Sequence, residues 1–316
     1  MVRKTSKSRG SSVIAALIVL CALIGYGLSE WKLLPDTMEA VPASRQAAEQ
    51  GMAPEKITLP EKGEPVRMLT MNAGNYFVPE DPRRSNFQVK YKPVEAREAI
   101  AELVRQSGAE IVGLSEMGGE AAVNDLQMRL KRKGVQLPHK VLVMRDGEDR
   151  GLVLLSKYPI VSNRSVTDMP VSGEPKRRKT MLRGILDATV KMPDSRQFRL
   201  IGVHLKSRLS RDGSAEETRR REAYALRDYL NGVMASQDGM PLLLYGDFND
   251  GPADSSVQVI QGPAKTDSRL NRLKPRDSRG ETWTIYYEDG DTYHSFDHIF
   301  INNTLKKRLG RKPPMG

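Results

Sequence analysis

An aspartate and an asparagine follow an apolar run in the second half of the chain. The run Leu242 to Tyr245 is long enough for a buried strand, and Gly246, Asp247, Phe248 and Asn249 end it. Side chains two residues apart on a strand point the same way. Asp accepts hydrogen bonds or binds a cation, whereas Asn both accepts and donates. The pair could therefore orient a water molecule and hold a phosphoryl oxygen; a polar turn after a core strand is the alternative.

Polar residues end other apolar runs in the same way: Asn72, Glu116, His204 and Asp297. A hard divalent cation takes oxygen ligands, and Mg²⁺ usually binds one or two carboxylates while keeping several waters. Glu116 is the best single candidate for such a ligand, with an exposed Glu at a strand exit as the alternative. A lone His such as His204 is more often structural than catalytic, and Asn72 alone indicates little.

Strands and helices mix from Pro65 onward, which predicts an α/β domain. Helical spacing of apolar residues predicts helices over 93–107, 119–133 and 215–235. Apolar runs and alternation predict strands over 66–72, 110–116, 140–145, 151–156, 180–191, 197–204, 241–246, 283–287 and 296–301. A loop-rich stretch is expected over 250–281, and a basic tail without regular structure over 304–316.

The N-terminus has the pattern of an export signal. A basic n-region over 1–10 precedes an uncharged, apolar stretch over 11–29. Its length lies between a spanning helix and a signal-peptide core, and an uncleaved signal anchor is preferred over a cleaved signal peptide. The positive-inside rule then predicts a catalytic domain outside the cytoplasm, either membrane-anchored or, if the signal is cleaved, secreted or periplasmic. Residues 30–64, rich in Pro and Ala, are expected to form a tether.

Composition restricts the chemistry further. The net charge of +11 is compatible with a polyanionic or phosphorylated substrate, although the charge is too diffuse to identify one. The only cysteine, Cys21, excludes an intramolecular disulfide and a cysteine-based zinc site. The 316 residues contain four histidines, too few to favour a His-rich metal site.

Residues 65 to about 303 resemble the endonuclease/exonuclease/phosphatase superfamily, the DNase I-like proteins. Six segments carry the resemblance in the family's order: Thr70-Met71-Asn72, Leu114-Ser115-Glu116, Gly151 to Pro159, Val203 to Ser207, Gly246 to Asp250, and Phe296 to Ile299. The resemblance implies a four-layer sandwich of two mixed β-sheets flanked by helices. It also implies a site where the strand-end loops of the two sheets meet.

The same resemblance implies roles for individual residues. Glu116, with Asn72 nearby, would hold Mg²⁺ or Mn²⁺ against the scissile phosphate. Asp247 would align the attacking water, Asn249 would hold a non-bridging oxygen, His204 would donate to the phosphate, and Asp297 would orient a terminal His. Arg183, Lys206 and Arg208 are candidate phosphate-side cations, with a solvated charged face as the alternative for each.

One expected motif does not occur. The family closes with a Ser-Asp-His motif and a final strand some tens of residues after Asp297, and no such motif follows Phe296-Asp297-His298 in this sequence. His298 would point away from a site that Asp297 faces, because adjacent strand residues face opposite ways. His294 lies three residues before Asp297, so on a regular strand it would also point away from the side that Asp297 faces. The last strand is therefore expected to be missing, which would leave a sheet position unpaired and the activity of this form in doubt.

The sequence thus predicts a divalent-metal-dependent phosphoesterase, with phosphodiester cleavage in nucleic acid favoured over phospholipid or inositol phosphate substrates. The alternative is an inactive protein that keeps the fold and serves as a phosphate-binding or interaction protein. The expected partners are a nucleic acid or other phosphodiester, and a membrane bound through residues 11–29.

Overall fold

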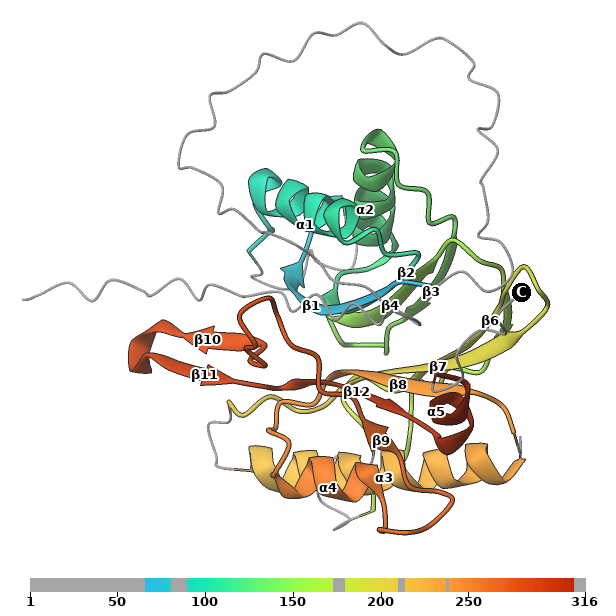
Figure 1. Cartoon of the computed structure of the whole chain (residues 1–316). Coiled ribbons are helices and arrows are strands. Elements are labelled where there is room, and N and C mark those ends of the chain that lie inside the picture. The colour runs from blue at the N-terminus through green and yellow to red at the C-terminus, as the bar shows by residue number, and fades with distance from the viewer. Residues whose placement is uncertain (1–65, 81–89, 173–179, 210–213, 237–238, 310–316) are drawn as a thin grey trace, which may run out of the picture.

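The computed structural model describes residues 66–80, 90–172, 180–209, 214–236 and 239–309. Two sheets stack face to face, and helices cover the outer face of each (Figure 1). The predicted anchor and tether, residues 11–64, lie outside the described residues. In the part that is described, no helix is long and apolar enough to cross a membrane.

The first sheet is built from the N-terminal half. Its strands are β1 (Met68–Tyr76), β2 (Ile111–Met117), β3 (His139–Val143) and β4 (Gly151–Ser156), in the order β1-β2-β4-β3. β1 and β2 run parallel, and the other pairs are antiparallel. Helices α1 (Val94–Ser107) and α2 (Glu120–Arg132) lie on its outer face (Figure 1).

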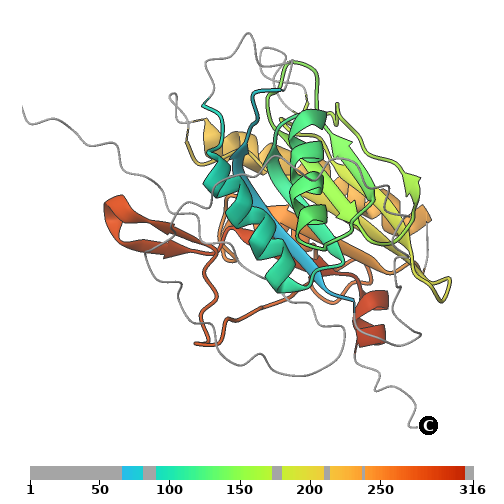
Figure 2. The same cartoon turned by 90° about the horizontal axis from the view of Figure 1, so that it is seen from above.

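The second sheet is built from the C-terminal half. Its order is β5 (Ile160–Asn163), β6 (Leu186–Lys191), β7 (Gln197–His204), β8 (Leu242–Asp247), β12 (Asp297–Ile301) and β9 (Asn271–Arg272). Helices α3 (Ala215–Ser236) and α4 (Ser255–Gln261) cover its outer face. A hairpin of β10 (Ile285–Tyr287) and β11 (Thr292–His294), joined by the 3-10 turn η2 (Glu288–Gly290), projects beyond the sheets in both views (Figures 1 and 2).

Three apolar layers join these four layers of secondary structure. Leu154 of the first sheet and Leu243 of the second lie in the layer between the sheets. The other two layers pack one sheet against α1 and α2 and the other against α3 and α4. Alternate residues of a strand face opposite sides, so each central strand supplies two layers at once. The predicted four-layer α/β sandwich of two mixed sheets is therefore confirmed.

Two short helices in the C-terminal part were not predicted. The stretch 250–281 is loop-rich as predicted but also contains α4, where Val257 and Ile260 are buried one turn apart. The expected tail begins with helix α5 (Asn303–Leu309), in which the Asn302 side-chain oxygen accepts the Leu305 amide at 2.9 Å and Leu305 is buried. Both helices have seven residues, too few to give a helical periodicity that a sequence pattern could detect.

Strand boundaries also differ from the prediction. The strand expected over 180–191 is regular only over β6, and Thr180 forms an isolated bridge with Pro170. The predicted absence of a last strand stays a prediction. In the described residues, β1 borders the first sheet and pairs only with β2, whereas β12 lies inside the second sheet between β8 and β9.

Candidate active site

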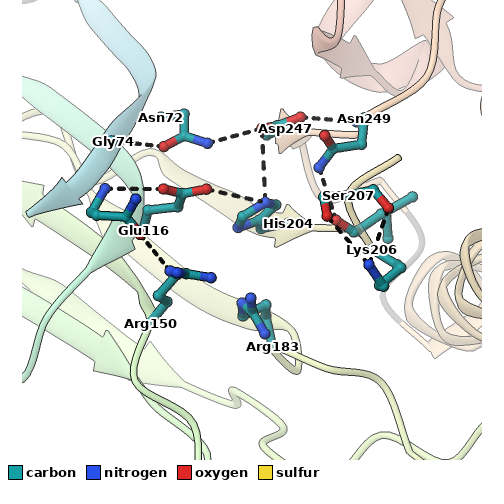
Figure 3. A network of polar contacts seen from close by, with 12 residues as sticks. Asn72, Gly74, Glu116, Arg150, Arg183, His204, Lys206, Ser207, Asp247 and Asn249 are labelled. Atoms are coloured by element: carbon teal, nitrogen blue, oxygen red, sulfur yellow. Dashed lines mark hydrogen bonds and ion pairs between the residues drawn. The ribbon is translucent and has the colours of Figure 1, made fainter. Parts of the chain in front are cut away.

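The ends of strands from both sheets meet at one edge of the sandwich. β7 and β8 run parallel, so His204 lies beside Asp247 in the ladder. β12 runs antiparallel to β8 and places Asp297 opposite Asp247. The Asn72 side-chain amide of β1 donates to the Asp247 carboxylate at 3.0 Å and thereby links the two sheets (Figure 3). Four of the predicted strand-end groups therefore lie together.

The backbone at these strand ends is unusual. Asn75, Glu116 and Asn249 all have positive φ angles, between 52° and 57°, which side chains other than glycine rarely adopt. The pairing register of β2 shifts between Leu114 and Met117, so Glu116 sits at a bulge. Bulges and left-handed residues re-aim side chains and are concentrated at functional sites. Here they turn the Glu116 carboxylate toward β7 of the other sheet.

The central feature is an imidazole between two carboxylates. His204 Nε2 lies 4.0 Å from Glu116 Oε1 and 3.8 Å from Asp247 Oδ2, too far for a direct hydrogen bond to either (Figure 3). Asn75 donates its backbone amide to Glu116 Oε2 at 2.9 Å, and Asn249 donates its amide to Asp247 Oδ1 at 2.8 Å. Each carboxylate is thus fixed by a backbone donor while one oxygen faces the gap.

Burial controls the charge of these groups. Burial lowers the pKa of His204 and outweighs Asp247 and Glu116, which favour the charged imidazole. Burial opposes ionisation of Glu116, but His204, Asn72 and further donors outweigh it, so the pKa of Glu116 is below its usual value. His204 Nδ1 is buried and has no partner among the described residues, so we assign the proton of the neutral ring to Nε2. The site thus presents an imidazole donor beside ionised Glu116.

Asp297 differs from the other carboxylates. Its Oδ1 atom is buried without a hydrogen-bond partner in the described part of the chain. Burial raises the pKa of Asp297 well above the usual value for Asp, and the charge of Asp247 raises it further. Thr284 accepts the Phe296 and Asp297 amides through Oγ1, at 2.9 and 3.1 Å, and fixes the start of β12.

The three predicted phosphate-side cations have different surroundings. Arg183 lies near His204 and forms an ion pair with Glu148 at 3.0 Å (Figure 3). Lys206 instead donates to its own loop, to Ser207 and to the Leu209 carbonyl. Arg208 donates to the Asn249 carbonyl and pairs with two neighbouring carboxylates. Of these three predicted cations, only Arg183 therefore lies on the side of the site that holds Glu116 and His204.

Sequence reasoning missed two cations near Glu116. Arg150 donates to the Asn75 side chain at 2.5 Å, and its charge favours ionised Glu116 (Figure 3). Lys92 is partly buried, and burial lowers the pKa of its amine while Glu116 opposes that shift. The position of Arg150 just before β4 could have predicted its place near Glu116. Gly151, the first residue of β4, pairs with Met117 at the end of β2 that carries Glu116. Lys92 is not part of any motif in the sequence.

Asp250 buttresses the loop that carries Asp247 and Asn249. Its carboxylate pairs with buried Arg219 at 2.8 Å and accepts the Ser256 hydroxyl at 2.6 Å. Arg219 therefore faces the interior from α3, whereas its neighbours Arg220 and Arg221 pair with Glu217 on the same helix.

The groups fit a hard, water-rich metal ion. Within the described ranges, no three His, Cys, Asp or Glu side chains are arranged to hold a metal ion. Mg²⁺ needs no such cage, because it binds through one or two carboxylates and keeps several waters. Glu116, whose side chain is 19% exposed, and the amide oxygen of Asn72 supply a donor set of this kind.

One of the solved structures similar to this chain supports the architecture. A hairpin deletion mutant of beta toxin from Staphylococcus aureus matches at 14% identity and a TM-score of 0.51, covering 79% of this chain and 89% of that one. A mannosyl-6-phosphatase from Bacteroides thetaiotaomicron matches at 18% identity, TM-score 0.49, with coverages of 66% and 76%. The catalytic domain of human Nocturnin matches at 18% identity, TM-score 0.47, with coverages of 68% and 77%. At these identities the first likeness shows the fold alone.

No curated protein sequence matches the chain. The sequence of residues 85–314, however, matches the Endonuclease/Exonuclease/phosphatase family, and this range includes the strand ends that carry Glu116, His204, Asp247 and Asp297. The family model groups endonucleases, exonucleases and phosphatases. The chain therefore belongs to the endonuclease/exonuclease/phosphatase family.

Proposed function

We propose that the protein is a divalent-metal-dependent phosphoesterase that cleaves phosphodiesters, as a nuclease does. The observation that supports this proposal most directly is the gap between Glu116 and Asp247, into which His204 Nε2 points from 4.0 and 3.8 Å. A phosphoryl group placed in that gap would contact donors and acceptors supplied by both sheets.

Each residue has a distinct task in this proposal. Glu116 and Asn72 hold Mg²⁺ or Mn²⁺, which offsets charge on the phosphoryl oxygens when bound. Asp247, fixed by the Asn72 amide, accepts a hydrogen bond from the attacking water and directs it in line with the leaving oxygen. Neutral His204 donates from Nε2 to a non-bridging oxygen, which stabilises developing charge without a proton transfer.

Asn249 and Arg183 complete the proposed phosphate site. The Asn249 side chain donates to the Leu205 carbonyl at 3.0 Å, which fixes its orientation beside Asp247. Arg183 supplies positive charge from the His204 side, although its ion pair with Glu148 reduces the net charge that it offers. Lys206 and Arg208 are turned to other partners, and we assign them no contact with the phosphate.

The test is hydrolysis of bis-p-nitrophenyl phosphate by the full chain with Mg²⁺, Mn²⁺ or EDTA. We expect turnover that needs metal and that falls at least about a hundredfold in Glu116→Gln and in Asp247→Asn. Glu110→Gln is the matched control, because Glu110 precedes the other end of β2 and pairs with Lys157. Equal activity in all three variants would contradict the proposed site.

A second candidate function is phosphate binding without hydrolysis. Asp297 Oδ1 favours it, since this buried atom meets no imidazole in the described residues. A folded protein that binds inorganic phosphate but turns over no ester under any metal condition would establish this alternative.

We also propose that residues 11–29 attach the protein to a membrane and that the catalytic domain lies outside the cytoplasm. The apolar stretch and the basic residues before it support this placement. Deletion of residues 1–29 should move the protein from the membrane fraction to the soluble fraction. An unchanged distribution would contradict the anchor.

A further inference from the structure

The projecting β10–β11 hairpin is unusually rich in aromatic residues and leads directly into the site. It is followed by Phe296 and then Asp297, the first residue of β12. Its ladder pairs Ile285 with His294, Tyr286 with Tyr293, and Tyr287 with Thr292. Because strand residues alternate, Tyr287 and His294 share one face of the hairpin while Tyr286 and Tyr293 share the other.

The first face forms a continuous aromatic surface with Phe296. The His294 ring stacks on Phe296 with centroids 5.1 Å apart and an interplanar angle of 23°. Tyr287 meets His294 edge to face at 5.7 Å. Tyr287 is 37% exposed, so its ring is available to a further stacking partner.

This face borders the candidate active site. The Arg208 guanidinium lies over the Phe296 ring at 4.7 Å and donates to the Asn249 carbonyl at 3.0 Å. The Phe248 amide, next to Asp247, donates to the Phe296 carbonyl at 2.8 Å. Burial raises the pKa of Tyr287, and the Asp247 charge raises it further, which agrees with a Tyr287 hydroxyl near that carboxylate.

The second face is separate and self-contained. Tyr293 packs against Trp283 at 5.1 Å and against Tyr286 at 4.8 Å. Tyr293 is 55% exposed. The same hairpin therefore offers a ring of equal chemistry that faces away from His294 and Phe296, which provides an internal control.

We propose that Tyr287 and His294 form a stacking subsite for the nucleobase of a nucleotide ester whose phosphate occupies the candidate active site. The assignment rests on the proposed phosphoesterase function and specifies its substrate. Aromatic side chains stack on any base, and each stacked base contributes about 1–3 kcal/mol by alanine substitution. Phe296, on which His294 stacks, directly precedes Asp297, so the aromatic face continues to the residue at the edge of the site.

The tip of the hairpin limits the size of this substrate. Glu288 and Asp291 are exposed at the turn between β10 and β11. A long polyanion that continued over the hairpin would meet these like charges. A substrate of one or two nucleotides avoids them, so the subsite selects small nucleotide esters over long strands.

The test compares two esters with the same leaving group, thymidine 5′-(p-nitrophenyl phosphate) and methyl p-nitrophenyl phosphate. The quantity measured is the ratio of their kcat/KM values. We expect Tyr287→Ala to lower this ratio about tenfold, mostly through KM for the thymidine ester. Tyr287→Phe keeps the ring and should retain the ratio within about twofold, and so should Tyr293→Ala on the other face.

Three outcomes would overturn the assignment. The first is an unchanged ratio in Tyr287→Ala, and the second is an equal loss in Tyr287→Ala and Tyr293→Ala. The third concerns a further ester, the p-nitrophenyl phosphate ester of deoxyribose without a base. If its kcat/KM equals that of the thymidine ester, the sugar is recognised rather than the base. A higher kcat/KM for a long oligothymidylate than for a thymidine dinucleotide would contradict the size limit.

A binding measurement separates this inference from the proposed function. Calorimetry with thymidine 5′-monophosphate and with inorganic phosphate needs no turnover. If no ester is hydrolysed by the wild type, the phosphoesterase proposal fails, whereas tighter binding of the nucleotide that is lost in Tyr287→Ala still supports the subsite. Equal affinities for the nucleotide and phosphate in the wild type would contradict the subsite alone. Melting temperatures confirm that each variant is folded.

Discussion

Asp297 and His298 are neighbours on β12 but face opposite sides of the sheet. Asp297 lies opposite Asp247 in the ladder, at the active-site edge. His298 Nε2 instead contacts the Asp250 carbonyl at 2.8 Å, and its ring packs against Phe248 at a centroid distance of 5.4 Å. His298 therefore belongs to the core beneath the site. His294 stacks on Phe296, so neither histidine is hydrogen-bonded to Asp297.

The buried imidazole makes stability dependent on pH. Burial lowers the pKa of His298 from 6.5 to about 4. As the pH falls through 6.5, the unfolded chain takes up a proton at this position and the folded chain does not until about pH 4, so stability decreases across this window. A difference of roughly 2.5 units corresponds to at most about 3 kcal/mol.

His298→Gln removes the titrating group and can still donate to the Asp250 carbonyl. We expect the wild type to lose about 2 kcal/mol more than the variant between pH 7 and pH 5. Urea unfolding at both pH values measures the difference. Identical losses in the two proteins would show that His298 is not buried as a neutral ring.

The contact between the sheets depends on glycine at position 113. A Cβ added at Gly113 would lie 2.1 Å from the Tyr245 ring, which crosses from β8 to β2. Gly113→Ala should lower the free energy of unfolding by about 1–3 kcal/mol through overpacking. Gly232→Ala in α3 is the matched control, because its Cβ meets nothing within 4 Å and Ala should stabilise the helix by about 1 kcal/mol.

Chemical denaturation measures both glycine variants. Replacing Tyr245 by Leu in the Gly113→Ala background should recover part of the loss, because it removes the ring that the new methyl group meets. No recovery would indicate that the loss arises elsewhere than at the contact between the sheets.

A buried ion pair joins β6, β7 and α3. Arg199 donates to Asp187 at 2.8 Å through Nε, and the Tyr229 hydroxyl donates to the same carboxylate at 2.5 Å. Removing one partner leaves a buried charge, so Asp187→Ala should cost about 3–5 kcal/mol. The exposed pair of Glu102 and Arg105 gives the comparison, and Glu102→Ala should cost less than about 1 kcal/mol.

The double variant Asp187→Leu/Arg199→Met tests the reason for this loss. It removes both charges together, and we expect thermal unfolding to show much higher stability than for Asp187→Ala. If the double variant is as unstable as the single variant, lost packing rather than an unpaired charge is responsible.

Arg150 should set the lower pH limit of activity. Its charge is one of the causes that lower the pKa of Glu116, so Arg150→Ala should raise that pKa. The proposed metal ligand must be ionised, and the acid limb of the kcat/KM profile should therefore move to higher pH. Arg145→Ala is the control, because Arg145 pairs with Asp168 outside the site. Overlapping profiles for Arg150→Ala and the wild type would contradict this role.

The sequence predicted the buried strands and the long helices well because their signals are local. The strand over 151–156 and the helix that begins at residue 215 depend on apolar patterns that no distant contact overrides. The short helices α4 and α5 depend on contacts with remote residues. Asn302, for example, caps α5 and also bonds to the Met240 carbonyl, 62 positions away.

The site was predicted only in part for a similar reason. Glu116, His204 and Asp247 lie at the ends of β2, β7 and β8, and strand ends meet at a sheet edge whatever the loops do. Asn72 is not the end of its strand as predicted, because β1 continues to Tyr76, but it lies where the pairing of β1 with β2 becomes irregular. The cations depend on loop conformation. Lys206 and Arg208 follow His204 closely in sequence, but their side chains bond to their own loop and to Asp250. Arg150 comes near Glu116 only because β4 pairs antiparallel with β2.

The division of the two sheets along the chain has a consequence for biosynthesis. Residues 68–156 complete the first sheet before the second begins at Ile160, so the two halves can form in succession as the chain leaves the ribosome. Glu116 and Asn72 lie on the first half, without the site residues that the second half supplies. His204 and Asp247 reach them only when the halves dock, so the proposed site is complete only in the assembled sandwich.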